Sequence, residues 1–154
     1  MESRLKITGQ VKLIFHNVNT GQDEVLEVSN TFVTTGKNSL AARLAGSDTP
    51  ANTKGAVTYM AVGTGTAVPG AGDVKLQTEN TRKQVSQRDF SGNVATFTTF
   101  FNTSEANANL REVGLFGDDA SDTTDSGTLF ARAAISKNKN SSETLTIEWT
   151  LTVN

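Results

Sequence analysis

The chain has 154 residues, the usual length of one domain, and 36% of them are hydrophobic, which is enough for a buried core. Its 14 basic and 16 acidic side chains give a formal net charge of -2, which provides no electrostatic footprint for DNA or RNA. The lack of cysteine excludes disulfides, thiolate metal sites and thiol catalysis, and a single histidine excludes a multi-histidine metal site within one chain. No apolar run approaches the roughly 20 residues of a membrane helix, so we expect a soluble chain with no membrane partner and no export signal.

The composition indicates a mainly β protein. The chain contains 23 Thr and 13 Asn beside 13 Gly, with two Pro. Threonine favours the pleated surface of strands, while Asn and Gly favour the turns between them. We therefore expect residues 1–154 to form a single domain, an antiparallel β-sandwich or distorted barrel of seven or more strands with one short α-helix over an open end.

Alternating apolar and polar residues predict three hairpins. The paired segments, in chain order, are Leu5–Phe15 with Val25–Val33, Lys83–Phe90 with Val94–Phe101, and Leu110–Phe116 with Thr128–Ser136. An Asn- and Gly-rich loop joins the first pair, a three-residue loop at 91–93 the second, and a long acidic loop at 117–127 the third. Thr58–Val62 is more continuously apolar and is expected to be a central strand.

One segment, Lys37–Ala45, has the pattern of a helix. Its expected buried stripe consists of Leu40, Ala41, Leu44 and Ala45, and Gly46 is placed as the C-terminal cap. Asp73–Arg82 is a candidate for a second, shorter helical turn.

The last strand shows the clearest period of two. Its apolar positions are Leu145, Ile147, Trp149, Leu151 and Val153, and they alternate with polar residues. Each fully buried large apolar side chain contributes ~1.5–3 kcal/mol, so this strand is expected to stabilise the core strongly. We expect all five side chains to be buried.

Two motifs invite a chemical interpretation. Gly63-Thr64-Gly65 follows a strand and could present amides to a phosphate, but it lacks the remaining residues of a dinucleotide fingerprint or a P-loop, so a structural turn is favoured. His16 could act as a base beside Asp23 or Glu24, but no nucleophile motif accompanies it. We expect no catalytic centre and no cofactor, and therefore no enzyme.

Four aspartates share one loop. They are Asp118, Asp119, Asp122 and Asp125. Their carboxylates are the ligand type that calcium prefers, but their spacing does not fit an EF-hand. A solvated acidic loop is the favoured interpretation, no metal is expected, and calcium binding stays open.

Two further sets of residues are assigned structural or contact roles. We expect Glu79, Arg82 and Glu112 to be structural partners that pin the strand after the 63–72 loop against Leu110–Phe116. Phe100 and Phe101 are neighbours on one strand, so they point to opposite faces and cannot both enter one core. One of them is expected to meet the helix or another subunit.

An ordered set of motifs resembles a known family. The motifs run from residue 36 to residue 132 and read GKNSLAARLAG (36–46), TYMAVGTG (58–65), Leu76, Glu79, Arg82, LREVGLF (110–116) and LFAR (129–132). In this order they resemble virion proteins of tailed bacteriophages, especially the N-terminal attachment domains of tail-collar and tail-fibre proteins, over roughly residues 30–135. The resemblance implies a non-enzymatic structural protein, assembled in the bacterial host cytoplasm as a collar, fibre-attachment or baseplate component of the tail. It also implies a homotrimer that docks on other virion proteins.

Two alternatives remain beside this resemblance. Tail-fibre proteins carry a long distal shaft, whereas this chain continues for one more strand and is expected to be a free-standing module, which also fits a decoration (cement) protein on the capsid. A carbohydrate-binding or hydrolytic β-sandwich module is the second alternative. Sugar binding would require clustered exposed aromatic side chains, whereas Trp149 and Tyr59 lie in predicted core strands.

Overall fold

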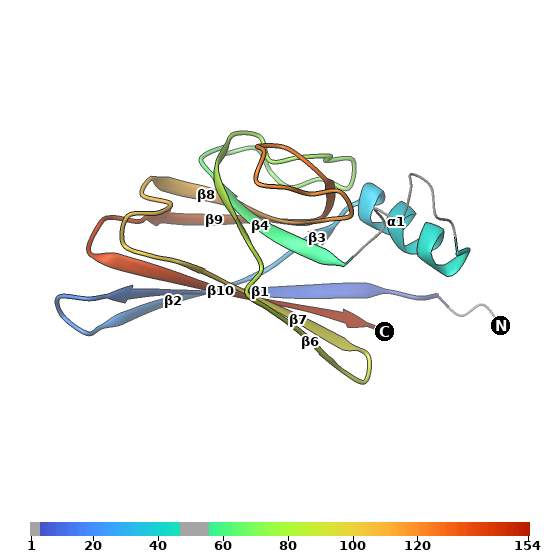
Figure 1. The fold of residues 1–154 in the computed structure, drawn as a ribbon, viewed down its shortest axis with the longest axis horizontal. Coiled ribbons are helices and arrows are strands. Elements are labelled where there is room, and N and C mark those ends of the chain that lie inside the picture. Colours follow the sequence, from blue (N-terminus) through green and yellow to red (C-terminus); the bar gives the residue numbers. More distant parts are fainter. Residues whose placement is uncertain (1–3, 47–55) are drawn as a thin grey trace.

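The computed structural model describes residues 4–46 and 56–154. In these residues it contains ten strands and one helix, which Figure 1 shows as two stacked layers with the helix at one end. The elements are β1 (Ile7–Asn17), β2 (Asp23–Ser29), β3 (Thr31–Phe32), α1 (Thr34–Leu44), β4 (Val57–Gly63), β5 (Glu79–Gln84), β6 (Gln87–Ser91), β7 (Val94–Phe101), β8 (Asn109–Gly117), β9 (Thr128–Asn138) and β10 (Glu143–Val153).

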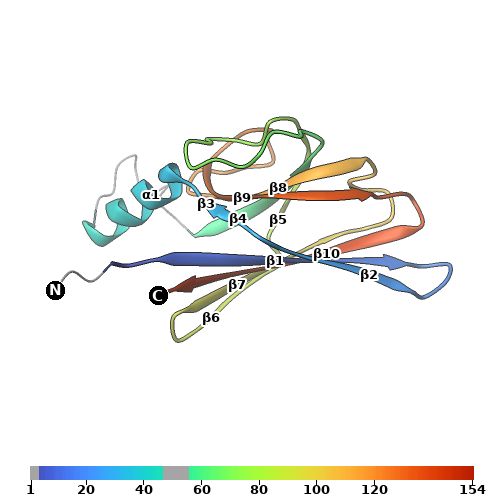
Figure 2. The ribbon, with the colours of Figure 1, turned by 180° about the vertical axis from the view of Figure 1, so that it is seen from behind.

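The strands form two antiparallel sheets of five strands each. Sheet A has the order β2-β1-β10-β7-β6, and sheet B has the order β3-β9-β8-β4-β5. The expectation of a mainly β antiparallel fold with one short helix is confirmed, and the fold is a sandwich rather than a closed barrel. Figure 2 shows from behind that α1 lies at the end where β1 begins and β10 ends.

The main core fills the space between the two sheets. Leu145, Ile147 and Trp149 are fully buried there, and Leu151 is nearly so. The Trp149 indole N–H donates a 2.9 Å hydrogen bond to the side-chain oxygen of Asn30, which satisfies its polar atom inside the core. Val153 differs from expectation because it is 40% exposed. It lies at the last position of β10, at the open end of the sandwich beside α1.

A second, smaller core lies on the other side of sheet B. Its buried members are Val33, Ala61, Leu76, Phe116 and Leu129. Leu76 comes from the loop between β4 and β5, and the partly buried Ala120 of the loop between β8 and β9 packs against the same cluster. These two loops therefore cover the outer face of sheet B (Figure 1).

The helix begins three residues earlier than the sequence pattern predicts, and it buries another face. Its buried residues are Gly36 and Ser39, whereas Leu44 of the predicted stripe is 88% exposed. A Cβ at Gly36 would lie 2.8 Å from the Phe130 backbone, so the missing side chain lets the helix approach β9 on that face. The predicted cap is correct: Gly46 has φ +66° and donates its N–H to the Arg43 carbonyl.

The first and third hairpins pair as predicted, as β1 with β2 and β8 with β9. The second differs, because Lys83–Phe90 is not one strand. The chain leaves sheet B after β5 and enters sheet A at β6, with the Val85 N–H bound to Thr58 and the Ser86 N–H to Thr98. Ser91 pairs directly with Val94, so the turn has two residues rather than three.

Two other predicted segments also differ. Val25–Val33 divides at Asn30, because β2 belongs to sheet A whereas β3 pairs with β9 in sheet B. Asp73–Arg82 contains no helical turn: residues 73–78 form an irregular loop, and β5 begins at Glu79. The N–H groups of Gln77 and Thr78 bind a side-chain carboxylate instead of helical carbonyls.

Candidate functional site

The covered outer face of sheet B is organised around one buried carboxylate. The Glu112 side chain, on β8, is 1% exposed. It accepts backbone N–H bonds of 2.9 Å from Gly65, 2.9 Å from Gln77 and 2.8 Å from Thr78. A Cβ at Gly63 or Gly65 would lie 2.6 Å from the Glu112 Oε1 atom. The Gly65 N–H of the Gly63-Thr64-Gly65 motif thus binds an anion that belongs to the chain itself, at the point where β4 ends and an irregular segment begins.

Arg132, on β9, neutralises this carboxylate. Its Nη2 and Nε atoms donate to Glu112 over 2.7 and 3.2 Å, and its Nη1 donates to Asp73 over 2.8 Å. Burial works against the charged form of Arg132, but its bonds to the two carboxylates prevail and raise its pKa. Burial likewise tends to raise the pKa of Asp73, yet the Gly70 N–H and Arg132 hold this pKa below its ordinary value.

Glu79 and Arg82 form a separate buried pair. Both side chains lie on β5 and are joined by two bonds, of 2.8 and 2.9 Å. The Arg82 guanidinium lies 4.5 Å from the centre of the Phe116 ring, and its Nη1 donates to the carbonyls of Ser121 and Ser126. Glu112 therefore does not pair with Arg82. The three predicted partners belong to two neighbouring networks, and sequence reasoning missed Arg132 as the partner of Glu112.

The acidic loop is attached to the body by several of its own residues. Asp118 accepts bonds from Ser39 (2.9 Å) and Arg43 (3.0 Å) of α1, and Asp125 pairs with Lys75 over 3.0 Å. Within residues 4–46 and 56–154, no group of three or more His, Asp or Glu side chains has the arrangement of a metal site. Asp118 and Asp125 thus bind cationic side chains from α1 and from the loop between β4 and β5.

His16 also has a partner. Its Nδ1 atom lies 2.6 Å from an Asp23 oxygen across the β1–β2 pair, and both side chains are about half exposed. Glu24, the other predicted partner, instead pairs with Lys137 over 2.6 Å. The register places Thr144 opposite His16 on the other side. This pair sits at the edge of the surface described next.

The outer face of sheet A has a regular pattern in its cross-strand register. One row runs Val25, Ile14, Thr146, Phe100 across β2, β1, β10 and β7. The next row runs Glu27, Lys12, Glu148, Thr98 across the same four strands. Residues that face each other in neighbouring strands have Cβ atoms about 4.5–5.5 Å apart, so each row is continuous. An apolar row thus lies beside a row in which one lysine sits between two glutamates.

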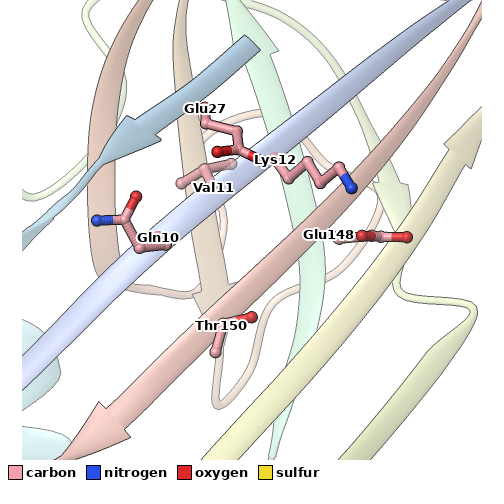
Figure 3. Close-up of a pocket in the computed structure, with 6 residues that line it drawn as sticks. All are labelled: Gln10, Val11, Lys12, Glu27, Glu148 and Thr150. Carbon is pink, nitrogen blue, oxygen red and sulfur yellow. The ribbon is translucent and has the colours of Figure 1, made fainter. Parts of the chain in front are cut away.

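A shallow hollow of about 300 Å³ lies on this face (Figure 3). It is lined by Gln10, Val11, Lys12, Glu27, Glu148 and Thr150. Figure 3 shows Lys12 extending from β1 toward β10, where Glu148 is located. In the part of the chain that the structure describes, Lys12 makes no ion pair, although Glu27 and Glu148 flank it in the cross-strand register.

Phe100 and Phe101, the two proposed contact residues, point to opposite faces of β7, as the alternation of side chains along a strand requires. Phe101 is buried in the main core, whereas Phe100 is 45% exposed and ends the apolar row of the outer face. Val25, at the other end of that row, is exposed to a similar degree. Phe100 therefore remains a contact candidate, and Phe101 is a core residue.

A second apolar feature lies at the open end of the sandwich. It is a slot of about 200 Å³ between α1 and the two sheets. Its lining consists of Ile7, Phe32, Leu40, Arg43, Val57, Ala95, Phe97, Phe130, Leu151 and Val153. Phe90, which pairs with Ala95, is 78% exposed nearby.

Comparison with known proteins adds no relative: no protein-family model, curated protein or solved structure matches the chain. Among the described residues, no helix has the length and apolar character needed to cross a membrane. The function is therefore inferred from the outer faces of the two sheets and from the motifs of the sequence.

Proposed function

We propose that this chain is a non-enzymatic structural protein of a tailed-bacteriophage virion, a peripheral tail component of the collar, fibre-attachment or baseplate type. It acts as a homo-oligomer that docks on other virion proteins and is assembled in the bacterial host cytoplasm. The observation that carries the docking role is the outer face of sheet A. This face combines an uncovered apolar row, from Val25 to Phe100, with an adjacent row of charges.

The motifs that resemble tail-collar and tail-fibre proteins occupy the other half of the molecule. They fall on α1, β4, β5, β8 and β9, and they include Glu79, Arg82, Glu112 and Arg132 of the buried networks. These elements build sheet B and anchor its loops. The resemblance therefore concerns the scaffold, while sheet A supplies a surface for contacts.

A capsid-decoration protein would also dock through the outer face of sheet A, so the two functions differ in where the chain lies on the particle. The carbohydrate alternative receives no support from the aromatic side chains. Trp149 is fully buried, and the exposed Phe90 and Phe100 lie on opposite faces of sheet A by their register.

Immunogold electron microscopy on intact particles tests the proposal. Particles of the phage that encodes the chain are labelled with an antibody raised against the purified protein, and particles of a phage lacking the gene serve as the control. We expect gold at the collar or baseplate. Gold over the head would establish the decoration alternative, and purified particles without the chain would contradict a virion role altogether.

A further inference from the structure

The outer face of sheet A has the size of one side of a stable protein interface. Apart from the edge strand β6, sheet A consists of β2, β1, β10 and β7, which contain 7, 11, 11 and 8 residues. At about 3.3 Å per residue and about 4.8 Å between strands, the face of these four strands measures roughly 590 Å². Two such faces give roughly 1,200 Å², which is the lower end of the range for a standard interface.

The charges on this face are self-complementary. A two-fold axis along the strands, midway between β1 and β10, would place β1 of one copy over β10 of the other. Lys12 would then face Glu148 of the second copy, and the symmetry would repeat this pair. The same rotation would place Glu27 over the uncharged Thr98, so no two like charges of this row would meet.

The apolar row is self-complementary about the same axis. The rotation places β2 over β7, so Val25 faces Phe100 of the second copy, and Ile14 faces Thr146. Val25 and Phe100, the half-exposed apolar side chains at the two ends of the row, would become covered in both molecules of the pair. One axis therefore matches both rows without moving a strand.

We propose that two copies of this chain pack face to face through the outer faces of sheet A, with reciprocal Lys12–Glu148 and Val25–Phe100 contacts. The strands of two aligned, packed sheets cross at about 30°, and the two-fold axis bisects this angle, so it lies at about 15° to the strands of each sheet. The partner's Lys12 would project toward the hollow shown in Figure 3. This inference rests on the proposed function, which makes the outer face of sheet A a docking surface. It predicts a dimer in place of the homotrimer that the resemblance implies.

Sedimentation equilibrium with charge-reversal variants tests the contact. The wild-type chain, Lys12→Glu, Glu148→Lys and the double variant are compared over about 1–100 µM. We expect a wild-type monomer–dimer equilibrium and a Kd at least about tenfold higher for each single reversal, because symmetry counts each change twice. The double variant should regain the wild-type Kd to within about threefold, because the facing charges are opposite again.

Asp89→Lys is the matched control. Asp89 lies on the same face, opposite Thr96, but its strand β6 is the edge of sheet A beyond β7 and has no counterpart in the overlapping sheets. This reversal should change the Kd by less than about threefold. The circular dichroism spectra of all variants should match the wild type, because these side chains are on the surface. The single reversals should lower the unfolding free energy of the dilute chain by about 1 kcal/mol at most, because each places like charges side by side in the row Glu27, Lys12, Glu148.

Several results would overturn the proposal. A strict monomer up to about 100 µM, a trimer, or a dimer whose Kd is unchanged by Lys12→Glu each contradicts the two-fold contact. None of these results affects the localisation of the chain on phage particles, so failure of the contact and failure of the virion role remain distinguishable.

Discussion

Sheet B has two loops folded over its outer face, whereas the outer face of sheet A is formed by strand residues without a second layer in the described chain. On sheet B, the charged side chains Glu79, Arg82, Glu112 and Arg132 are almost fully buried and bind one another or the loop backbone. On sheet A, Lys12 and Glu148 remain at the surface.

This contrast distinguishes internal structure from a contact surface. A buried charge is costly unless its bonds are complete, so the networks of sheet B define one position for each loop. Surface charges and half-exposed apolar side chains carry little stability by themselves, and they are free to match a partner. Substitutions on the two faces should therefore affect different measurements.

The largest expected effect follows from Glu112→Gln. This change preserves the shape of the side chain but leaves the Arg132 charge without its main buried partner. Breaking a buried pair in this way costs about 3–5 kcal/mol. Urea unfolding, followed by the fluorescence of the buried Trp149, measures this loss.

Glu148→Gln is the same chemical change on the outer face of sheet A and should cost less than about 0.5 kcal/mol. Equal losses for the two variants would remove the distinction between the faces.

A smaller loss is expected from Gly65→Ala. The added methyl group would lie 2.4 Å from the Gln77 Cβ atom and 2.6 Å from the Glu112 carboxylate, and overpacking of this kind costs about 1–3 kcal/mol. Gly72→Ala, in the same loop, has no atom within 4 Å of its Cβ and is the matched control. If both variants unfold at the same urea concentration, the close approach of Glu112 to this loop does not contribute to stability.

The sequence predicted the parts of the fold that depend on local alternation. The period of two placed four side chains of β10 in the core, and Gly46 marked the end of α1. Local patterns carry no information about which sheet a strand joins, so the division of Lys83–Phe90 between β5 and β6 was missed. The buried face of α1 depends on the contact of Gly36 with Phe130, which is 94 positions away.

The candidate site was predictable to a lesser extent. Alternation separated Phe100 from Phe101, but the apolar row requires the register of four strands. Glu79 and Arg82 are three residues apart and could be paired from sequence, whereas Arg132 is 20 positions from Glu112 and lies in an otherwise apolar stretch of β9. A charged residue among buried neighbours was the available signal.

The next effect concerns pH. The bonds of Asp73 hold its pKa below its ordinary value in the folded chain, so its contribution to stability is present above the pKa of the unfolded state, near 4. This contribution disappears as the pH falls through the lower, folded pKa. Asp73→Asn should cost about 1 kcal/mol at pH 7 and reduce the loss of stability between about pH 5 and 2. Unfolding free energies at a series of pH values measure it, and an unchanged acid slope would contradict the role of the Arg132 bond.

The smallest effect on stability is expected from Thr146→Val. Thr146 stands between Ile14 and Phe100 in the apolar row, so the substitution extends that row without changing the core. The unfolding free energy should change by less than about 0.5 kcal/mol, while self-association tightens a few-fold. Sedimentation equilibrium measures the second quantity, and weaker association would count against contact through this row.

Carboxylate footprinting tests both faces in one measurement. A water-soluble carbodiimide couples an amine to accessible Asp and Glu side chains, and peptide mass spectrometry gives the rate of coupling at each position. We expect Glu112 and Glu79 to remain unmodified in the folded chain at every protein concentration, because their side chains are 1% exposed. Glu148 should react readily in dilute protein and become protected as the concentration rises, while Asp89 reacts equally throughout. Modification of Glu112 as fast as that of Glu148 would contradict the buried networks of sheet B. A coupling rate at Glu148 that does not change with protein concentration would contradict the contact through sheet A.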